Sequence, residues 1–338
     1  MTTTLADIAE KTGLSQATIS RTLNNKPGVS SKTKAMIFKT MEELGMNPSA
    51  SRATEMKQVA LITPDMSNPI FANFATNLSV LLSQQHTLPL LCAYTLYGGN
   101  ESSYMEEILN YHISGAIFLS GQYDTKGTDL SHYYTLAKQR IPMVFLNASA
   151  HEVDGFYVET DDMTAVNTAL THLINLGHSK IGLLFGDKDH YPSIRKYEAA
   201  ERFFHEKKID HDPRLTVWTT YGIGSGQMAT TALIKAGATA IMCASDQLAL
   251  GAIKAATALN LSVPEDISIT GYDDSLAMNY ISPSLTTVRQ PVDLMSRALV
   301  NGFNTLQADP RTATKRNIAI YEPELVVRGS TGICRVRR

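Results

Sequence analysis

Thr4-Leu-Ala-Asp-Ile-Ala-Glu-Lys-Thr-Gly-Leu-Ser-Gln-Ala-Thr-Ile-Ser-Arg-Thr-Leu-Asn24 decides how the chain begins to fold, because it reads as two short helices joined by a tight turn. Ala9 is small where two helices must approach closely, and Ile19 supplies an apolar anchor on the second helix. Gly13 can take the left-handed conformation that such a turn needs. The stretch therefore predicts a helix-turn-helix.

Capping residues mark the starts of both helices. Thr4 with Asp7, and Ser15 with Thr18, stand three positions apart, as in a capping box. A third helix is expected from about residue 30 to 44, where apolar residues recur at helical spacing before a glycine. Three helices over residues 1–48 make a small DNA-reading headpiece.

The charge distribution agrees with a nucleic-acid partner at this end of the chain. Residues 1–58 carry eight Lys or Arg against five Asp or Glu, whereas the whole chain of 338 residues has a net charge of −2. A plain helical cap with a solvated basic face is the alternative. Such a cap would not explain the spacing of Ala9, Gly13 and Ile19.

The rest of the chain alternates short apolar runs with helical patterns, which indicates parallel sheets covered by helices. About 270 residues of this pattern favour two lobes with a ligand crevice between them over one sheet. The polar segment 49–58 predicts a hinge or linker. The predicted class is α/β, with a small all-α headpiece before a two-lobed, parallel-sheet core. The predicted strands lie near 59–63, 88–94, 115–119, 142–147, 157–161, 180–186, 216–221, 240–245 and 267–272.

Composition excludes several other classes of protein. No apolar run approaches the roughly 18 residues of a membrane span, and no signal peptide is recognisable, so a cytoplasmic protein is expected. Cys92, Cys243 and Cys334 are far apart and lack metal-ligand spacing, so they are expected to be reduced packing residues. No catalytic triad order, phosphate loop or His-x-x-x-His pair is present. No metal, cofactor or enzymatic activity is therefore predicted.

Several further motifs stand in one order along the chain and resemble those of the LacI/GalR family of transcriptional regulators, over residues 4 to 331. They are Val29-Ser-Ser-Lys-Thr33, Glu43-Leu-Gly-Met-Asn-Pro48, Pro64-Asp-Met-Ser-Asn-Pro69, Leu176-Gly-His178, Ile267-Ser-Ile-Thr-Gly-Tyr-Asp-Asp274 and Ser284-Leu-Thr-Thr287. The resemblance implies a periplasmic-binding-protein-like effector core at 59–331 and a basic tail at 332–338. Its N-lobe would span about 59–156 and 291–318, and its C-lobe about 157–288 and 319–331.

The resemblance also implies partners. A homodimer would act as a repressor by binding an inverted-repeat operator in double-stranded DNA, and a sugar or sugar derivative between the lobes would modulate its operator affinity. No heptad pattern follows the core, so a tetramer held by a C-terminal coiled coil is not expected.

The family's second helix lies in the major groove, which implies base-reading roles for three residues here. Gln16 can pair with adenine, Arg21 with guanine, and Ala17 can contact a thymine methyl group. Neighbouring hydroxyl and amide groups would hold phosphates. The hinge is about four residues shorter than in the family and lacks its minor-groove Leu, for which Met56 is the candidate substitute. The predicted DNA-binding residues are Thr4, Ser15, Gln16, Ala17, Thr18, Arg21, Asn24 and Met56.

The resemblance places the effector residues at the ends of predicted strands, where they suit a polar, ring-shaped ligand. They are Asn68, Phe71, Asn147, Arg195, Lys196, Tyr221, Ser245, Asp246, Asp273 and Gln290. Either Arg195 or Lys196 would take the place of the family's pocket arginine. With Arg289, these cations leave an acidic or phosphorylated sugar as one alternative. Helix capping by Asp246 or Asp273, a core position for Phe71 and a turn at Asn147 are the structural alternatives.

One motif favours a different class of protein. Gly222-Ile-Gly-Ser-Gly226 follows a predicted strand, precedes a helix and has Asp246 about 20 residues further on, as dinucleotide sites do. The third glycine of that fingerprint is missing, and an oxidoreductase would not explain the headpiece. The other alternative, a small-molecule binding protein without operator recognition, conflicts with residues 1–50.

Overall fold

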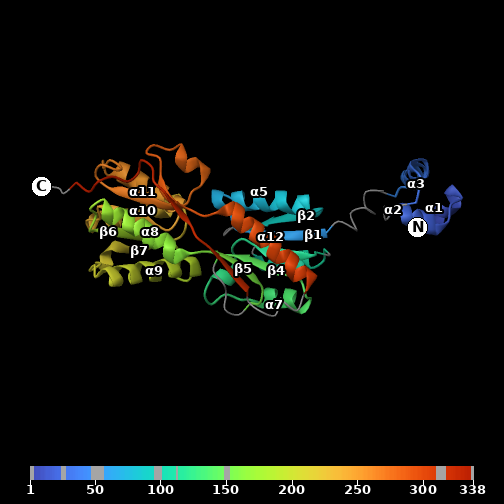
Figure 1. Ribbon diagram of the computed structural model, residues 1–338, viewed down its shortest axis with the longest axis horizontal. Coiled ribbons are helices and arrows are strands. Elements are labelled where there is room, and N and C mark those ends of the chain that lie inside the picture. The colour runs from blue at the N-terminus through green and yellow to red at the C-terminus, as the bar shows by residue number, and fades with distance from the viewer. Residues whose placement is uncertain are drawn as a thin grey trace. The chain divides into compact units, whose positions relative to one another are not determined.

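The computed structural model describes residues 4–23, 28–46, 57–94, 101–111, 113–147, 153–309 and 317–335 (Figure 1). The headpiece and the core are separate compact units. No helix in these described ranges is both long and apolar enough to cross a bilayer.

The headpiece contains three helices: α1 (Leu5–Thr12), α2 (Gln16–Leu23) and α3 (Ser31–Glu43). They pack around Ile8, Ile19, Ile37 and Met41, whose side chains are at most 1% exposed. Gly13 ends α1 at φ +69°, and its N–H donates to the Ala9 carbonyl at 2.9 Å. The predicted helix-turn-helix is thus confirmed.

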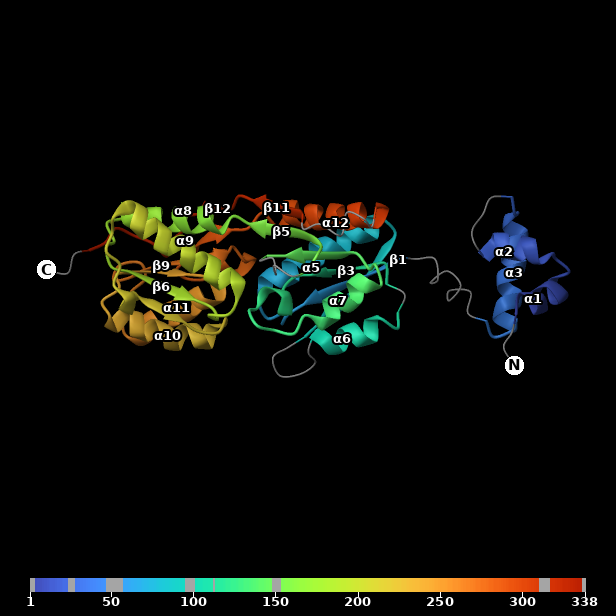
Figure 2. The ribbon, with the colours of Figure 1, turned by 90° about the horizontal axis from the view of Figure 1, so that it is seen from below.

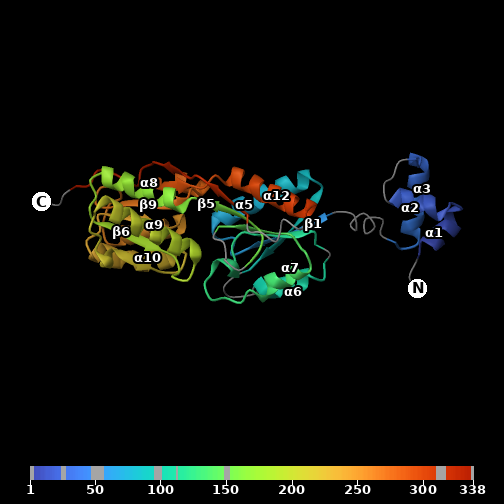
Figure 3. The same ribbon diagram turned by 60° about the horizontal axis from the view of Figure 1, so that its bottom comes forward.

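The first sheet of the core has six strands in the order β11-β5-β4-β3-β1-β2. Its strands are β1 (Lys57–Thr63), β2 (Thr87–Ala93), β3 (Gly115–Phe118), β4 (Met143–Leu146), β5 (Phe156–Thr160) and β11 (Asn317–Tyr321). Figure 3 shows α5 (Pro69–Gln84) and α12 (Val292–Ala308) on one face, and α6 (Glu101–Ile108) and α7 (Ser131–Lys138) on the other.

Alternation along β1 explains why both faces of this sheet are covered. Val59 and Leu61 are buried in the cluster that includes α5 and α12. Ala60 and Ile62 are buried in the cluster that includes α6 and α7. Successive side chains of a strand point to opposite faces, so an apolar run such as this one needs a helical layer on each.

The second sheet has the order β12-β10-β9-β8-β6-β7. Its strands are β6 (Ile181–Phe185), β7 (Thr216–Trp218), β8 (Ala240–Cys243), β9 (Ser268–Asp273), β10 (Thr286–Arg289) and β12 (Glu324–Val326). Figure 2 shows α8 (Asp162–Asn175) and α9 (Tyr191–Lys207) on one side, with α10 (Ile223–Lys235) and α11 (Asp246–Ala258) on the other. β12 runs antiparallel to β10, whereas the other registered pairs of this sheet are parallel.

The chain crosses between the two sheets three times: from β5 to α8, from β10 to α12, and from β11 to β12. The predicted N-lobe boundaries at 156 and 318 need correction, because β5 and β11 both belong to the first sheet. The crossings follow Thr160, Arg289 and Tyr321. β10, β11 and β12 were not among the predicted strands. β11 and β12 are only five and three residues long, and both are partly exposed.

The segment after β12 stays on the second lobe and is held there by a buried histidine. His178 Nε2 donates to the Gly332 carbonyl at 3.1 Å, and its Nδ1 accepts from the Thr239 hydroxyl at 3.0 Å. The Cys334 N–H donates to the Leu176 carbonyl at 2.8 Å. The first residues of the predicted basic tail therefore dock on the lobe, and residues 336–338 lie outside the described ranges.

This arrangement predicts a pH dependence of stability. Burial lowers the pKa of His178 below 6.5. His178 is therefore protonated less readily in the folded protein than in the unfolded chain. The unfolded state is then favoured as the pH falls through about 6.5. We expect the melting temperature to fall on acidification from about pH 7.5 to 5.5, and His178→Gln to reduce that fall. The exposed His86→Gln is the control. An unchanged pH dependence in His178→Gln would contradict the assignment.

Candidate functional site

One face of α2 is exposed and carries the three predicted base-reading residues. Gln16, Ala17 and Arg21 are exposed, whereas Ile19 and Thr22 of the same helix are buried. Ala17 and Arg21 are one helical turn apart and share a face. The apolar side of α2 thus fixes the helix on the headpiece and leaves the opposite side open to a partner.

The start of α2 is held by side-chain hydrogen bonds. Thr18 N donates to Ser15 Oγ at 3.2 Å, and the two hydroxyl groups are 2.9 Å apart. At the start of α1, the Thr4 N–H and hydroxyl both donate to Asp7 Oδ2, at 2.5 and 3.0 Å. These bonds satisfy helix-terminal N–H groups and orient the hydroxyls that were predicted to contact phosphates.

Two predicted DNA-binding residues cannot be placed. Asn24 and Met56 lie outside the described residues, as does most of the predicted hinge at 49–58. Their proposed contacts stay predictions.

The core contains a cavity of about 570 Å³ between its lobes. Residues at the carboxyl ends of strands from both sheets line it, which is where ligands bind in open α/β sheets. From the first sheet these include Pro64 after β1, Tyr94 after β2, Ser120 after β3 and Asn147 after β4. From the second they include Asp187 after β6, Tyr221 after β7, Ser245 after β8 and Asp273 at the end of β9.

The cavity collects most of the predicted effector residues: Asn68, Phe71, Asn147, Lys196, Tyr221, Ser245, Asp273 and Gln290. Two of them also cap helices. Asn68 Oδ1 accepts from Ile70 N at 3.4 Å at the start of α5, and Ser245 Oγ accepts from Leu248 N at 3.2 Å at the start of α11. Arg195 and Asp246 do not line the cavity, so the prediction needs correction at both positions.

Arg195 points instead to carboxylates near the β5–α8 crossing. Its Nη2 is 2.6 Å from Glu159 Oε2, and its Nε is 3.5 Å from Asp162 Oδ2. Arg289 likewise pairs with Asp274 at 2.7 Å and with Glu324 at 3.2 Å, and it does not line this cavity. Of the two adjacent cations considered in the sequence, Lys196 is the one that reaches the cavity.

Lys196 is buried and its charge is compensated. Its Nζ is 2.9 Å from Asp162 Oδ1 and lies 4.2 Å from the centroid of the Tyr272 ring. A desolvated ammonium group is tolerated because both the carboxylate and the ring face stabilise it. Lys196 therefore orders the end of the cavity beside the three crossings between the lobes. This end is called the hinge side of the cavity, and it is distinct from the predicted linker at 49–58.

Asp273 lies at the same end in a strained backbone conformation. Its φ is +123°, and its side chain is buried. Gln290 Nε2 donates to Asp273 Oδ1 at 2.8 Å, while Thr160 Oγ1 donates to Gln290 Oε1 at 2.9 Å. Burial and the nearby Asp246 carboxylate raise the pKa of Asp273 well above its usual range. Backbone strain and a perturbed pKa in a cavity are typical of a functional position.

Asp246 has a structural environment. Its Oδ1 accepts from the Thr287 hydroxyl at 2.6 Å and its Oδ2 accepts from Ser275 N at 2.7 Å. Burial raises the pKa of Asp246 to about 7 despite these hydrogen bonds. The carboxyl group thus ties α11 to the strand ends behind the cavity wall.

Gly226 of the glycine-rich segment Gly222–Gly226 serves helix packing. A Cβ on Gly226 would lie 2.8 Å from the Leu248 carbonyl oxygen, and one on Gly251 would lie 2.3 Å from the Ile223 carbonyl oxygen. Both contacts are closer than real Cβ atoms approach, so the glycines allow α10 and α11 to pack together. With Asp246 directed elsewhere, these residues do not form the dinucleotide site that the motif suggested.

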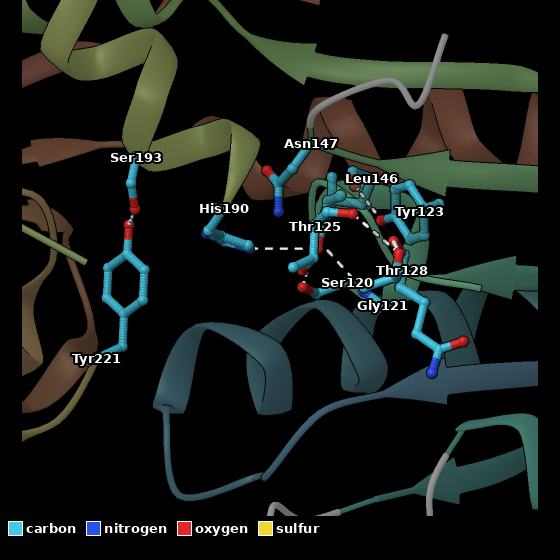
Figure 4. Close-up of polar contacts among 12 residues, drawn as sticks. Ser120, Gly121, Tyr123, Thr125, Thr128, Leu146, Asn147, His190, Ser193 and Tyr221 are labelled. Atoms are coloured by element: carbon cyan, nitrogen blue, oxygen red, sulfur yellow. Dashed lines mark hydrogen bonds and ion pairs between the residues drawn. The ribbon is translucent and has the colours of Figure 1, made fainter. Parts of the chain in front are cut away.

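A direct contact between the lobes lies beside the cavity. Thr125 and His190 form an antiparallel bridge, Lys126 N donates to the Asp189 carbonyl at 2.7 Å, and His190 Nε2 is 3.3 Å from Asp124 Oδ1. Figure 4 shows His190 directed toward the segment that carries Ser120 and Thr125.

The same view shows the Tyr221 and Ser193 hydroxyl groups facing one another, 2.8 Å apart (Figure 4). The His190 and Tyr221 rings have an edge-on contact with centroids 5.6 Å apart. Sequence reasoning predicted Tyr221 but missed His190 and Asp124. The position of Asp124, just after the strand at 115–119, was the available signal.

Sequence reasoning also missed Glu101, a buried carboxylate at the first-lobe wall. It lines the cavity, and its Oε2 accepts from Gln122 N at 2.7 Å. Its Oε1 accepts from the Tyr133 hydroxyl and lies 3.2 Å from His132 Nε2. Glu101 lies beyond the predicted strand at 88–94 and in none of the motifs, so no local sequence pattern marked it as a cavity residue.

Comparison with family models gives two matches. Residues 4–49 match the model for bacterial regulatory proteins of the lacI family, and residues 170–331 match a periplasmic binding protein-like domain. The HTH-type transcriptional regulator reg1 of Streptomyces lividans is 38% identical over 337 residues, covering 98% of this chain and 97% of the relative. The HTH-type transcriptional regulator MalR of Streptomyces coelicolor is also 38% identical, with the same coverage of both chains.

Solved structures have the same fold. A lac repressor dimer bound to operator and the anti-inducer ONPF has a TM-score of 0.79 at 24% identity, covering 98% of this chain and 100% of that one. A complex of the transcriptional regulator CelR with cellobiose has a TM-score of 0.72 at 24% identity, covering 97% and 100%.

Proposed function

Because the chain belongs to the lacI family of bacterial regulatory proteins and is a DNA-binding transcriptional regulator, we propose that it represses transcription as a homodimer whose operator affinity depends on a sugar or sugar derivative bound between the lobes. One observation carries the proposal: a single chain combines an exposed reading face on α2 with a cavity between two lobes. The lac repressor dimer on its operator and the CelR–cellobiose complex, which share the fold, support it.

We propose that α2 enters the major groove with Gln16, Ala17 and Arg21 facing the bases. Gln16 would pair with adenine, Ala17 would contact a thymine methyl group, and Arg21 would donate two hydrogen bonds to guanine. Thr4, Ser15 and Thr18 would bind phosphates and fix the register of the helix. Two headpieces of a dimer would then read an inverted repeat.

Arg21→Ala is expected to weaken specific operator binding by about 1–3 kcal/mol, roughly 5- to 150-fold, because a bidentate base contact is lost. Binding to non-operator DNA should change less, since one phosphate-attracting charge is a small part of that affinity. Fluorescence anisotropy with operator and scrambled duplexes measures both. Arg21→Lys, the matched control, keeps the charge but loses the planar fork, so it should also lose specificity. Full operator affinity in Arg21→Ala would refute the assignment.

Coupling between effector and operator would run through the arrangement of the lobes. The three crossings lie at one end of both sheets, and the Asp124–His190 contact joins the lobes elsewhere. An effector that contacts both lobes stabilises one arrangement of the lobes. If the two headpieces of a dimer fit the operator in only one of these arrangements, the effector changes the operator affinity. The coupling must be reciprocal: the effector changes operator affinity by the factor by which the operator changes effector affinity.

The test is selection of genomic fragments by the purified full chain at physiological salt, followed by titration of the recovered site with sugars, sugar acids, sugar phosphates and nucleosides. A palindromic site whose affinity shifts with one compound is the expected result. Sequence-independent, salt-sensitive binding alone would overturn specific operator recognition. Sedimentation at micromolar protein should show a dimer, and a stable monomer would overturn the two-headpiece geometry.

The proposal also assigns the protein a binding role without an enzymatic step and a place in the cytoplasm, where chromosomal DNA is accessible. The relatives are named as transcriptional regulators, which supports this choice over a nucleotide-dependent enzyme.

A further inference from the structure

We infer that the effector is a neutral carbohydrate of at least two sugar rings, bound along the cavity from the hinge side to the strand β2 side, and that anionic sugars are excluded. This inference rests on the proposed function, since it specifies the ligand of the same cavity. It is carried by three features: the charges that line the cavity, the length of the cavity and its volume.

The ionisable side chains of the cavity wall are mostly acidic. Among the described residues that line it there are five carboxylates, one lysine, one histidine (His190, 3.3 Å from Asp124) and no arginine. The carboxylates are Asp65, Glu101, Asp124, Asp187 and Asp273. A phosphate or carboxylate ligand would meet this acidic wall without the arginine or lysine clamp that such groups need.

The one lysine does not offset these charges, because Lys196 is already paired with Asp162. Burial raises the pKa values of Asp187 and Asp273, and the wall also holds Asp65, Glu101 and Asp124. Of the three cations that made an acidic sugar an alternative in the sequence, Arg195 and Arg289 lie outside the lining and are held by other carboxylates.

Of the helix starts at the cavity, those of α5 and α11 are capped by their own side chains, whereas the start of α9, where His190 and Pro192 line the cavity, has no side-chain cap. Asn68 accepts from Ile70 N at the start of α5, and Ser245 accepts from Leu248 N at the start of α11. These side chains occupy N–H groups that an anion would use.

Neutral sugars fit the same wall. Carboxylate and amide oxygens accept hydrogen bonds from hydroxyl groups, and aromatic faces cover the apolar faces of sugar rings. The cavity offers such rings along its length, since aromatic residues from both lobes line it. They are Phe71, Phe74, Tyr94, Tyr221 and Tyr272.

The cavity is longer than one ring. In the first sheet its lining follows β4, β3, β1 and β2, and in the second it follows β9, β8, β6 and β7. Neighbouring strands are about 4.8 Å apart, so three steps along either sheet span about 14 Å. Asp273 and Lys196 lie at the hinge side, whereas Tyr94 and Glu101 lie at the β2 side.

The volume agrees with the length. A hexose has about a dozen non-hydrogen atoms, and even at the roughly 30 Å³ that one water occupies in the liquid it would fill no more than about 360 Å³. The cavity holds about 570 Å³. One ring would therefore leave more than a third of the cavity unfilled.

The test uses the purified full chain and calorimetric titration with matched sets of ligands: a monosaccharide, its di- and trisaccharides, and its 6-phosphate and aldonic acid, for glucose, galactose and xylose where each exists. We expect one neutral di- or trisaccharide to bind about tenfold or more tightly than its monosaccharide, and the matched anions to bind at least about tenfold more weakly than the neutral sugar. A monosaccharide or an anion as the tightest ligand would overturn the inference.

Tyr94→Ala tests the second-ring position. Loss of this ring should lower oligosaccharide affinity by about tenfold and leave the monosaccharide affinity unchanged. Tyr94→Phe keeps the ring and should keep the affinity. Tyr111→Ala, which removes an exposed tyrosine of the same lobe outside the cavity, is the matched control. Equal losses for both ligands, or no loss, would overturn the position of the second ring.

Operator binding, measured on the same samples, separates the two levels of the argument. If a monosaccharide or an anion shifts operator affinity, the proposed function stands and the inference on ligand class fails. If the operator is bound specifically but no carbohydrate binds or shifts it, both the ligand class and the sugar-dependent part of the proposed function fail.

Discussion

Ile19→Ala is expected to abolish operator binding while leaving the effector core folded. Ile19 is fully buried among Ile8, Ile37 and Met41, which are the buried apolar residues of the headpiece. Truncating a buried isoleucine to alanine costs about 2–5 kcal/mol. A domain of this size rarely has more than about 3–5 kcal/mol of stability, so the substitution removes most or all of it.

The measurement combines operator affinity with two unfolding transitions. The full chain should lose specific binding and part of its helical circular dichroism, whereas the thermal transition of the core should be unchanged because the headpiece is a separate unit. Ile19→Val is the matched control and should cost only about 0.5–1.5 kcal/mol. Retention of operator affinity in Ile19→Ala would contradict the packing that positions α2.

Asp273→Gly is expected to weaken effector binding by about 1–3 kcal/mol, roughly 5- to 150-fold, while operator affinity without effector stays unchanged. The substitution removes the carboxyl group from the hinge-side end of the cavity and leaves Gln290 Nε2 without that acceptor. Glycine suits the φ of +123° at this position, so the loss of the side chain is not confounded by new backbone strain.

Titration calorimetry with the identified effector and an operator-release assay measure the effect. Asn260→Gly is the matched control, because Asn260 is an exposed residue at φ +57° outside the cavity. That variant should keep the wild-type effector response. A full response in Asp273→Gly would remove Asp273 from the effector site.

The headpiece and the general class of the core could be predicted because their signals are local. The turn at Gly13, the caps at Thr4 and Ser15, and the apolar spacing of the helices each involve residues within one or two helical turns. Strand runs such as that of β1 are equally local. The short strands β11 and β12 gave no such signal, since their pairing partners β5 and β10 lie far away in sequence.

The cavity was predictable in position but not in its charges. Arg195 and Lys196 are adjacent, yet successive residues of a helix point about 100° apart, so only one of them faces the cavity. Which one does so depends on the packing of α9 and on Glu159 and Asp162, which come from a different part of the chain. A pattern within one helix does not contain that information.

The sequence by itself determined a three-helix reader of DNA joined to a two-lobed α/β core, because capping, turn formation and hydrophobic periodicity act between near neighbours. Only the tertiary structure decided which polar groups the ligand meets. Asp124 and His190 approach one another across 66 positions, and Asp246, predicted in the cavity, is held behind its wall by Thr287 and Ser275. Buried charges take the partners that folding brings to them, because a desolvated charge without a partner is too costly to keep, and those partners are set by the packing of distant elements.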